Sequence, residues 1–449
     1  MIAQDIAKFV CSTEFKDIPP RAVAKAKNYF LDCIGVTLAG SIDRNARIIT
    51  EHVSEIGGTP ESSVLGTRAR VPATSAALAN GVASHALDYD DTSDILIGHP
   101  SVISCPPSLA IGEAMGATGR DVLAAYILGG EVACRLGQAL TDKQYSIGWH
   151  NTGTMGVFGA TVAAGKLLRL NEDQMAHAIG IAASSVAGIK INFGTSCKPY
   201  HVGQACSSGV RAAILAKKGF TSSLDAIEGK GGLAQLLSGV FHADKIASIG
   251  KPFVIGEPGY TTKMYPSCAY THSAMDAALE IRRSPNFDVE DVISVDCACS
   301  QVAVDTVVYK IAQNALQGKF SMPYCVSVCL LEGRATLAEF TDEKTSDPKV
   351  VDLEKKVTFH TDEVINARGY LDRGAKVKIT LKDGKQIVRE TRHPKGDPEN
   401  PLESDDYVEK YVACAKLVLS DNLAKESAKS LLDVENCRDI RLIVSTLSA

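Results

Sequence analysis

The 449-residue sequence predicts a mainly α protein, with a large all-helical domain and a smaller α+β domain. Up to about residue 255, apolar residues recur at helical spacing in segments rich in Ala and Gly, which is typical of helices buried on several sides. Beyond that point, short runs alternate apolar and polar residues, which indicates strands. We therefore expect a helical domain at residues 1–255, completed by residues 396–449, and an α+β domain at residues 256–395.

Helices of the first domain are recognised by their ends. Pro19-Pro20 precedes a segment with apolar residues at helical spacing, and Gly40 closes it, which is the usual order of proline at the start and glycine at the end. A helix is expected from about Gly159 to Leu170. Asn171 should cap the next one, because its side chain can accept a hydrogen bond from the first turn. Residues 207–218 should form a further helix.

Strands of the second domain follow from alternation and turn chemistry. Residues 293–299 alternate, and so do residues 377–381, which Asp383-Gly384 connects to a returning run at 386–390. An Asp-Gly pair between alternating runs predicts a hairpin. Helices are expected between these strands at about 271–282 and 321–331, and the tail from about Ser404 should be helical again.

Composition excludes several classes of protein. The net charge of −5 and the balanced 22% of charged residues are unlike those of a nucleic-acid binder, which needs a basic face. No run reaches the roughly 18 apolar residues of a membrane span, and the first residues lack the pattern of a signal peptide, so a cytoplasmic protein is expected. The 13 cysteines are scattered without metal-ligand spacing, so we expect reduced thiols and no metal.

An acidic segment at residues 85–94 stands out within the Ala-rich region, because buried carboxylates are costly unless they are paired or used. One interpretation is a D-D-x-x-D motif in which Asp90 and Asp94 share a helical face and hold Mg²⁺ against a diphosphate. A second acidic motif is missing from the sequence, and 6% of aromatic residues is low for a prenyl-transfer pocket. A solvated acidic turn is the other alternative.

Three further clusters mix cationic groups with glycines. His150 follows Gly148-Trp149 and is a candidate acid or base. Lys198 and His201 precede the expected helix at 207–218, where Lys198 could bind a carboxylate. Cys268 lies at the domain junction beside Lys263, in a sequence without the signature of a thiol nucleophile. Together these clusters indicate a polar pocket for a small polycarboxylate.

The motifs resemble those of the MmgE/PrpD family, which includes 2-methylcitrate dehydratases, cis-aconitate decarboxylases and iminodisuccinate epimerases. The resemblance spans nearly the whole chain and rests on motifs in order: Ser84–Thr92 with His99-Pro100, Gly148–His150, Lys198–Gly203, Lys263–Pro266 and Phe320–Tyr324. It implies a helical domain made from the N-terminal part and the tail, and an α+β lid over the cleft. It also implies a homodimer that needs no cofactor or metal, and that binds neither nucleic acid nor membrane.

The resemblance also implies site residues. Asp88, His99, His150 and the lid residue Tyr324 match catalytic positions, and Thr92, Lys198, His201, Lys263 and Cys268 match positions that bind substrate. The loop between Thr92 and His99 is one residue longer than in the decarboxylase. Cys268 replaces a histidine of the decarboxylase, which counts against cis-aconitate decarboxylation.

The resulting hypothesis is a cofactor-free lyase or isomerase of small di- or tricarboxylates, in first place a hydro-lyase similar to 2-methylcitrate dehydratase. Lys198 and Lys263 would hold carboxylates, and their charge would stabilise the anion that forms when the α-proton leaves. Asp88 or His150 would be the base, and His99 or Tyr324 would protonate the departing hydroxyl. A decarboxylase, an epimerase and a non-catalytic polycarboxylate-binding protein are the alternatives.

Overall fold

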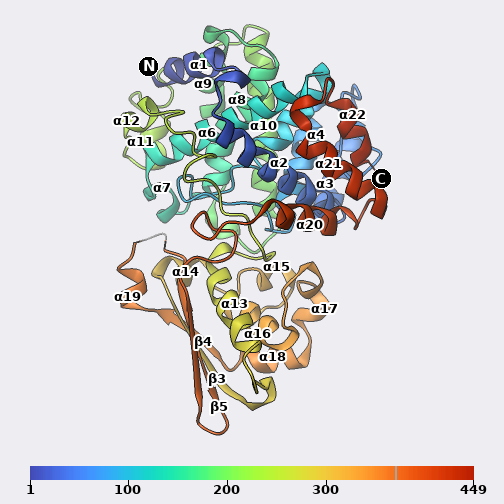
Figure 1. The fold of residues 1–449 in the computed structure, drawn as a ribbon. Coiled ribbons are helices and arrows are strands. Elements are labelled where there is room, and N and C mark those ends of the chain that lie inside the picture. Colours follow the sequence, from blue (N-terminus) through green and yellow to red (C-terminus); the bar gives the residue numbers. More distant parts are fainter. Residues whose placement is uncertain (370–371, 449) are drawn as a thin grey trace. The chain divides into compact units, whose positions relative to one another are not determined.

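The structure is a computed structural model that describes residues 1–369 and 372–448. The chain divides into two compact units. Unit 1 comprises Met1–Asn192, Ser196–Thr261 and Glu403–Ala449, and unit 2 comprises Phe193–Thr195 and Thr262–Leu402. Helices predominate, as the sequence predicts (Figure 1). Among the described residues, no helix combines the length and apolar character needed to cross a membrane.

Unit 1 is built from helices, with a two-stranded ribbon as its only sheet among the described residues. Its helices are α1 (Ile2–Ser12), α2 (Pro20–Ser41), α3 (Arg44–Ile56), α4 (Ala73–Ala86), α5 (Cys105–Met115), α6 (Gly119–Leu140), α7 (Lys143–Ser146), α8 (Asn151–Leu167), α9 (Glu172–Ala183), α10 (Cys197–Lys217), α11 (Leu233–Leu237), α12 (Ala243–Ala247), α20 (Ser404–Ala415), α21 (Asp421–Leu432) and α22 (Arg441–Val444). The ribbon pairs β1 (Ser62–Ser63) with β2 (Arg70–Val71).

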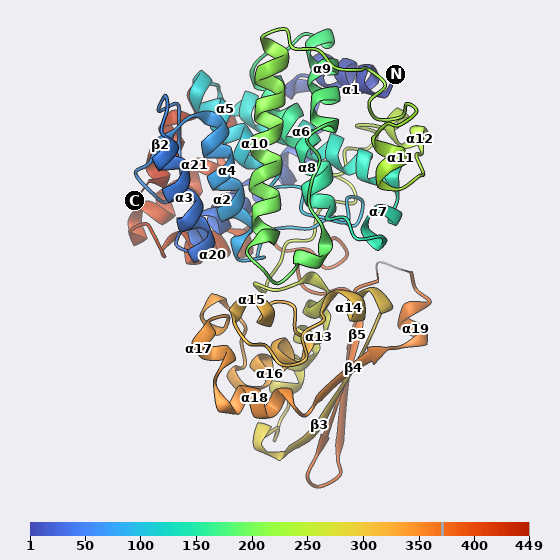
Figure 2. The same cartoon turned by 180° about the vertical axis from the view of Figure 1, so that it is seen from behind.

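Helix α10 lies between α4 and α8, and these three helices form the centre of unit 1 (Figure 2). Glycine allows the close approach. A Cβ added to Gly203 of α10 would lie 2.5 Å from the Leu78 carbonyl oxygen of α4, and one added to Gly81 would lie 2.8 Å from the Cα of Gly203. The short distance between the two backbones brings side chains at the end of α4 close to those at the start of α10.

The C-terminal helices pack within unit 1, although the whole of unit 2 precedes them in the sequence. Helix α20 lies against α2, and α21 also contacts α2 (Figure 1). Buried apolar and aromatic residues, including Tyr411, form this contact. Tyr411 packs close to Gly35 of α2, where an added Cβ would lie 2.9 Å from its ring.

Unit 2 combines a four-stranded sheet with helices. The strands are β3 (Val292–Cys299), β4 (Val357–Thr361), β5 (Ala375–Leu381) and β6 (Gln386–Thr391) in the order β4-β3-β5-β6. The β3–β4 pair is parallel, and the other pairs are antiparallel. The helices are α13 (Ala269–Arg282), α14 (Gln301–Thr306), α15 (Ala315–Gly318), α16 (Met322–Glu332), α17 (Asp342–Thr345), α18 (Pro348–Glu354) and α19 (Glu363–Asn366). Helix α13 packs on β5 and β6 and against α16.

Several local predictions are confirmed. Helix α2 begins at Pro20, Asn171 caps α9 by accepting a hydrogen bond from the backbone N–H of Gln174, and β5 and β6 form the hairpin. In β3, Val295, Cys297 and Cys299 are buried as predicted, but Ala298 is buried as well. Ile293 is exposed where the register with β5 shifts between Val292 and Ser294.

Two helix starts were placed too late. Helix α8 begins at Asn151 rather than near Gly159, because its glycines pack closely against other helices instead of forming a turn. Helix α10 begins at Cys197 rather than Ser207, since Pro199 falls in its first turn, where a missing backbone N–H has no cost. Lys198 and His201 therefore lie on the helix itself and not before it.

Candidate active site

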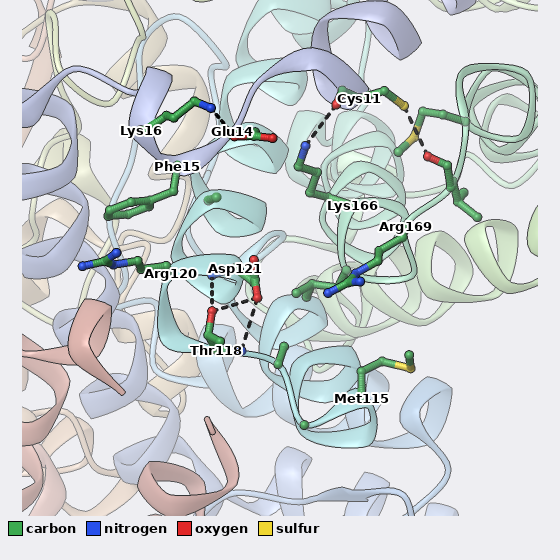
Figure 3. Close-up of a pocket in the computed structure, with 16 residues that line it drawn as sticks. Cys11, Glu14, Phe15, Lys16, Met115, Thr118, Arg120, Asp121, Lys166 and Arg169 are labelled. Atoms are coloured by element: carbon green, nitrogen blue, oxygen red, sulfur yellow. Dashed lines mark hydrogen bonds and ion pairs between the residues drawn. The ribbon is translucent and has the colours of Figure 1, made fainter. Parts of the chain in front are cut away.

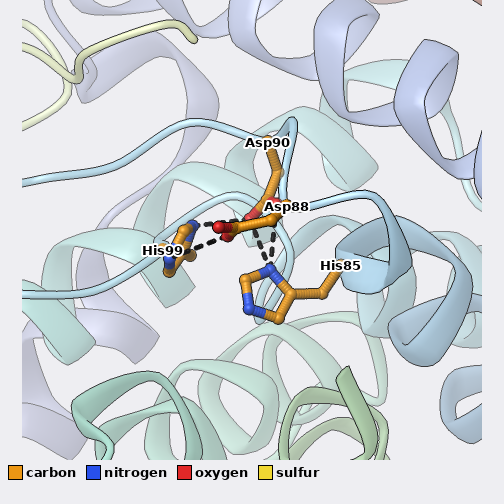
Figure 4. A group of neighbouring side chains, drawn as sticks. All are labelled: His85, Asp88, Asp90 and His99. Atoms are coloured by element: carbon orange, nitrogen blue, oxygen red, sulfur yellow. Dashed lines mark hydrogen bonds and ion pairs between the residues drawn. The ribbon is translucent and has the colours of Figure 1, made fainter. Parts of the chain in front are cut away.

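A group of buried polar side chains lies where α4 ends and α8 and α10 begin, all within unit 1. Helix α4 supplies His85 in its last turn, and the non-helical segment that follows supplies Asp88, Asp90 and His99 (Figure 4). His150 is the N-cap residue of α8, and Lys198 and His201 lie in the first two turns of α10. We call these residues the unit 1 cluster.

Lys198 is the buried cation of this cluster. Its Nζ donates hydrogen bonds to Asp88 Oδ1 at 2.7 Å and to His85 Nε2 at 2.8 Å. The Lys198 residue is only 5% exposed. A buried ammonium needs such partners, because the loss of hydration is otherwise not compensated. The start of α10 thus holds a positive charge against the end of α4.

Asp90 lies between two imidazoles. His85 Nδ1 is 2.9 Å from Asp90 Oδ1, and His99 Nδ1 is 2.8 Å from Asp90 Oδ2. On its other side, His99 Nε2 is 3.9 Å from Asp88 Oδ1. The rings of His85 and His99 meet edge to face, with centroids 4.4 Å apart. In Figure 4 the two carboxylates and the two imidazoles face one another.

His150 and His201 form a second imidazole pair, with their Nδ1 atoms 3.1 Å apart. Burial, reinforced by the Lys198 charge, lowers the pKa of His150 well below its usual range and that of His201 to about 4. Burial also lowers the pKa of His85 to about 3 despite the opposing effect of Asp90. At neutral pH these imidazoles are therefore uncharged, which leaves each with one donor and one acceptor nitrogen.

The backbone at Asp88 adopts a conformation that is uncommon outside glycine, with φ of 51°. Aspartate is among the residues that tolerate this left-handed region. The turn ends α4, and the Asp88 N–H donates to the His85 carbonyl at 3.1 Å. The segment after α4 is not helical, so Asp88 and Thr92 do not share a helical face.

The other members of the acidic segment have separate environments. Asp91 Oδ1 accepts from the Ser101 N–H at 3.1 Å, and its second oxygen contacts the Ser101 hydroxyl. Thr92 is fixed through its backbone, whose N–H donates to the Thr261 carbonyl at 2.9 Å, while its buried hydroxyl lacks a hydrogen-bond partner among the described residues. Asp94 is exposed. The Asp90–Asp94 face that the D-D-x-x-D interpretation requires is not formed.

Lys263, Cys268 and Tyr324 belong to unit 2 and are buried there. The Cys268 N–H donates to the Lys319 carbonyl at 2.9 Å. The Tyr324 hydroxyl donates to the carbonyl oxygen of Glu339, and burial raises the pKa of Tyr324. Within unit 2, then, the Tyr324 proton is already used in a backbone hydrogen bond.

His85, Asp88, Asp90 and His99 also have the composition of a metal site, since one potential ligand atom from each lies within 4.8 Å of the others. The Lys198 ammonium, however, is bonded to Asp88 Oδ1 and His85 Nε2, two of these four groups. A divalent cation there would be repelled by the lysine and would have to displace it. The arrangement suits a lysine-centred anion site better than a metal centre.

A separate cavity of about 890 Å³ lies elsewhere in unit 1 (Figure 3). It is lined by the end of α1, the end of α5, the start of α6 and the end of α8, and includes Arg120 and Lys166. Lys166 donates to the Val10 carbonyl at 2.8 Å. None of the cluster residues lines this cavity, so it is not the site that the motifs predict.

Sequence reasoning missed His85 and Asp90 as members of the site. It identified Asp88, His99, His150, Lys198 and His201, which the structure brings together around them. The spacing is a signal for His85. It precedes Asp88 by three residues, which is about one helical turn, so the two side chains can lie close together at a helix end. Nothing in the sequence separates Asp90 from the adjacent Asp91, which accepts from Ser101 instead.

Comparisons with known proteins agree with the motifs. Residues 4–245 match the MmgE/PrpD N-terminal domain, and residues 265–435 match the MmgE/PrpD C-terminal domain. Human cis-aconitate decarboxylase is 25% identical over 464 residues, which cover 99% of this chain and 94% of that protein. Cis-aconitate decarboxylase of Aspergillus terreus strain NIH 2624 is 23% identical over 100% of this chain and 96% of its own. Mitochondrial 2-methylcitrate dehydratase of Yarrowia lipolytica is 24% identical over 85% of this chain and 77% of its own.

Proposed function

Because the chain belongs to the MmgE/PrpD family, we propose that it is a lyase that removes a proton next to a carboxylate of a small di- or tricarboxylate, in first place a dehydratase. The observation that carries this proposal is the buried Lys198 among neutral imidazoles. A buried ammonium attracts a carboxylate strongly, and uncharged imidazoles can accept and deliver protons. We propose that the reaction needs no metal or organic cofactor, as the family resemblance implies.

Substrate binding follows from the charge of the cluster. Lys198 is neutralised by Asp88 in the free protein. An incoming carboxylate can share the ammonium, which has three donors, and so dock beside Asp88 without leaving the lysine unpaired. We also assign Thr92 and His201 to substrate binding. The Thr92 hydroxyl has no hydrogen-bond partner among the described residues, and His201 contacts His150 through its Nδ1.

Proton transfer is assigned to His150 and His99. His150 takes the α-proton, the electron pair forms the new carbon–carbon double bond, and the β-hydroxyl leaves with a proton from His99 as water. The low pKa of His150 in the free protein keeps it unprotonated at neutral pH. The negative charges of the bound substrate then raise the pKa of His150 toward the range in which proton transfer is efficient.

Decarboxylation is the second candidate. The cis-aconitate decarboxylases align over nearly the whole chain, which favours it. In that reaction the carbon–carboxylate bond breaks, CO₂ leaves, and an acid of the site protonates the resulting carbanion. Cys268 counts against it, because the decarboxylase resemblance places a histidine there. Epimerisation, in which the α-proton is removed and returned on the other face, needs the same groups.

We also propose that unit 2 is a lid that contributes Lys263, Cys268 and Tyr324 to the reaction, and that the chain acts as a homodimer. The resemblance of the motifs around these residues to those of the family supports both ideas. Light scattering of the purified chain should give twice its own mass. A stable monomer with full activity would remove the dimer from the proposal.

The experiment that tests the function is a screen of methylcitrate, citrate, cis-aconitate and iminodisuccinate, followed by mass spectrometry and chiral analysis. Loss of water supports the dehydratase, loss of CO₂ the decarboxylase, and inversion without a mass change the epimerase. Chelator-treated and untreated protein should turn over equally. Lys263→Met should lose turnover in the same screen, whereas the exposed Lys355→Met should not. Binding without turnover of any compound would contradict the lyase and favour a polycarboxylate-binding protein.

A further inference from the structure

We propose that Asp90 is the positioning residue of the unit 1 cluster, which holds a proton on Nδ1 of both His85 and His99, so that His85 Nε2 faces Lys198 and His99 Nε2 faces Asp88. Its kinetic consequence rests on the function proposed above, but its structural content does not. The proposal starts from three contacts of buried atoms, those of Asp90 with each imidazole and that of Lys198 with His85.

The tautomer of His85 follows from its two neighbours. An ionised carboxylate can only accept hydrogen bonds, so His85 Nδ1, which is 2.9 Å from Asp90 Oδ1, carries the proton. Lys198 can only donate, so His85 Nε2, at 2.8 Å from its Nζ, carries the lone pair. Both contacts therefore require the same neutral tautomer of His85, with the proton on Nδ1. Through this ring, Asp90 is linked to the lysine that is proposed to bind substrate.

His99 is oriented by the second oxygen of the same carboxylate. Its Nδ1 lies 2.8 Å from Asp90 Oδ2 in an ion-pair contact whose alignment is not that of a hydrogen bond. Because the carboxylate can only accept, this contact favours a proton on Nδ1. The other ring nitrogen, Nε2, then faces Asp88 and lies 3.9 Å from its Oδ1. A histidine whose far nitrogen is held by a buried carboxylate has its ring fixed and its basicity raised, which is the arrangement of acid–base histidines in hydrolase triads.

Asp90 is suited to this role by its surroundings. It is 0% exposed, and although burial favours the protonated form, His85 and His99 hold the pKa of Asp90 well below its usual range. The charged and titratable groups that face His99 and its partners are few and can be named. Among the described residues they are His85 in the last turn of α4, Asp88 and Asp90 after it, Lys198 and His201 on α10, His150 on α8, and Asp32 and Asp91, whose charges act on Asp90.

Asp91 shows what a structural carboxylate in the same segment looks like. It contacts the backbone and side chain of Ser101, whose hydroxyl in turn lies 2.6 Å from the Tyr126 hydroxyl. None of these groups is a predicted site residue. Asp90, one position earlier, instead has the imidazoles of His85 and His99 as its side-chain partners among the described residues. The difference points to Asp90 as a part of the reaction machinery and not of the fold alone.

The first test uses the whole protein without substrate. Nitrogen NMR of histidine-labelled chain distinguishes the protonated from the unprotonated nitrogen of each neutral ring, and His85→Gln and His99→Gln assign the two signals. We expect both rings to carry the proton on Nδ1. Because neutral histidine in water prefers the proton on Nε2, finding either ring in that form would overturn the proposal. This result does not depend on which compound the enzyme converts.

The second test is kinetic and uses Asp90→Asn. The amide accepts from one imidazole but must donate to the other, so one ring is forced into the wrong tautomer. We expect kcat/KM to fall between about 10²-fold and 10⁴-fold, the range typical of lost carboxylate partners of functional histidines. The pH profile of kcat/KM should also move to lower pH, since removing a negative charge disfavours the imidazolium.

The matched control is Asp94→Asn, because Asp94 lies in the same segment but is exposed. Its profile should superimpose on that of the wild type. A uniform loss of activity in Asp90→Asn with an unmoved pH profile would mean a merely structural role and would refute the proposal. If the wild type converts none of the screened compounds while NMR finds both Nδ1–H tautomers, the proposed function fails and the positioning role stands.

Discussion

At the scale of single residues, Lys198 is the residue that we propose binds substrate, and its replacement should test the role of its charge. Lys198→Met removes the ammonium that donates to Asp88 and leaves this carboxylate buried. We expect kcat/KM to fall by about 10³-fold or more, as when a transition-state charge loses its partner. Lys198→Arg keeps the charge and should retain part of the activity, with KM affected more than kcat.

Steady-state kinetics with the converted substrate measures this effect. Lys217→Met is the matched control, because Lys217 is exposed at the other end of the same helix. It should leave kcat/KM within about twofold of the wild-type value, as expected for an exposed position away from special features. Equal activity of Lys198→Met and Lys217→Met would contradict the role of Lys198.

Residue identity was easier to predict than residue environment. The motifs pointed to Asp88, His99, His150 and Lys198, because these types are chemically unusual inside an Ala-rich helical region. The tautomers and pairings could not be predicted, since they depend on which atoms meet after folding. Asp90 and Asp91 are adjacent in sequence, yet one contacts imidazoles and the other Ser101.

At the scale of elements, the distance between α4 and α10 sets the geometry of the cluster. Gly203→Ala would place a methyl group 2.5 Å from the Leu78 carbonyl oxygen, so the two helices must move apart. Because α4 carries His85 and α10 carries Lys198, their 2.8 Å contact should lengthen. We expect destabilisation by about 1–3 kcal/mol, typical of overpacking, and a loss of activity in the protein that remains folded.

Urea unfolding and the kcat of the folded fraction measure the two effects separately. Ser207→Ala, a half-buried position one turn further along α10, is the control and should change neither by much. Full activity of Gly203→Ala with reduced stability would show that the helix spacing does not control the site.

Element boundaries were predicted well where local chemistry sets them and poorly where tertiary packing does. The Asn171 cap and the Asp383-Gly384 turn act within a few residues, so the sequence alone predicts them. The starts of α8 and α10 depend on neighbours. Glycines that usually end helices are helical in α8 because the close approach of other backbones leaves no room for a Cβ.

At the scale of the whole molecule, the return of the tail to unit 1 is the feature that links the C-terminus to the candidate site. Lys410 of α20 is buried, with Nζ 2.8 Å from Asp32 Oδ1 of α2 and 2.9 Å from the Tyr89 carbonyl oxygen. Tyr89 lies between Asp88 and Asp90 in the sequence, and its ring centroid is 3.9 Å from the same ammonium. Helical spacing predicted α20 itself, but not this contact across 321 residues of the chain.

Lys410→Met should therefore affect both the fold and the site. It leaves Asp32 buried without its cation, which should cost about 3–5 kcal/mol of the free energy of unfolding, as in other broken buried ion pairs. Adding Asp32→Leu removes the orphaned charge and should restore much of this stability. The double variant still lacks the hydrogen bond to Tyr89, so its kcat should stay below that of the wild type.

Urea unfolding and steady-state kinetics of the single and double variants separate these contributions. Lys425→Met is the control, because Lys425 forms an exposed ion pair with Asp421 at 2.7 Å within α21. Breaking such a surface pair should change the free energy of unfolding by less than about 1 kcal/mol and leave kcat unaltered. If Lys410→Met changed the free energy of unfolding and kcat as little as Lys425→Met, the tail would pack on α2 without contributing to the site. If the double variant recovered stability without recovering kcat, the tail would act on the reaction through the backbone at Tyr89.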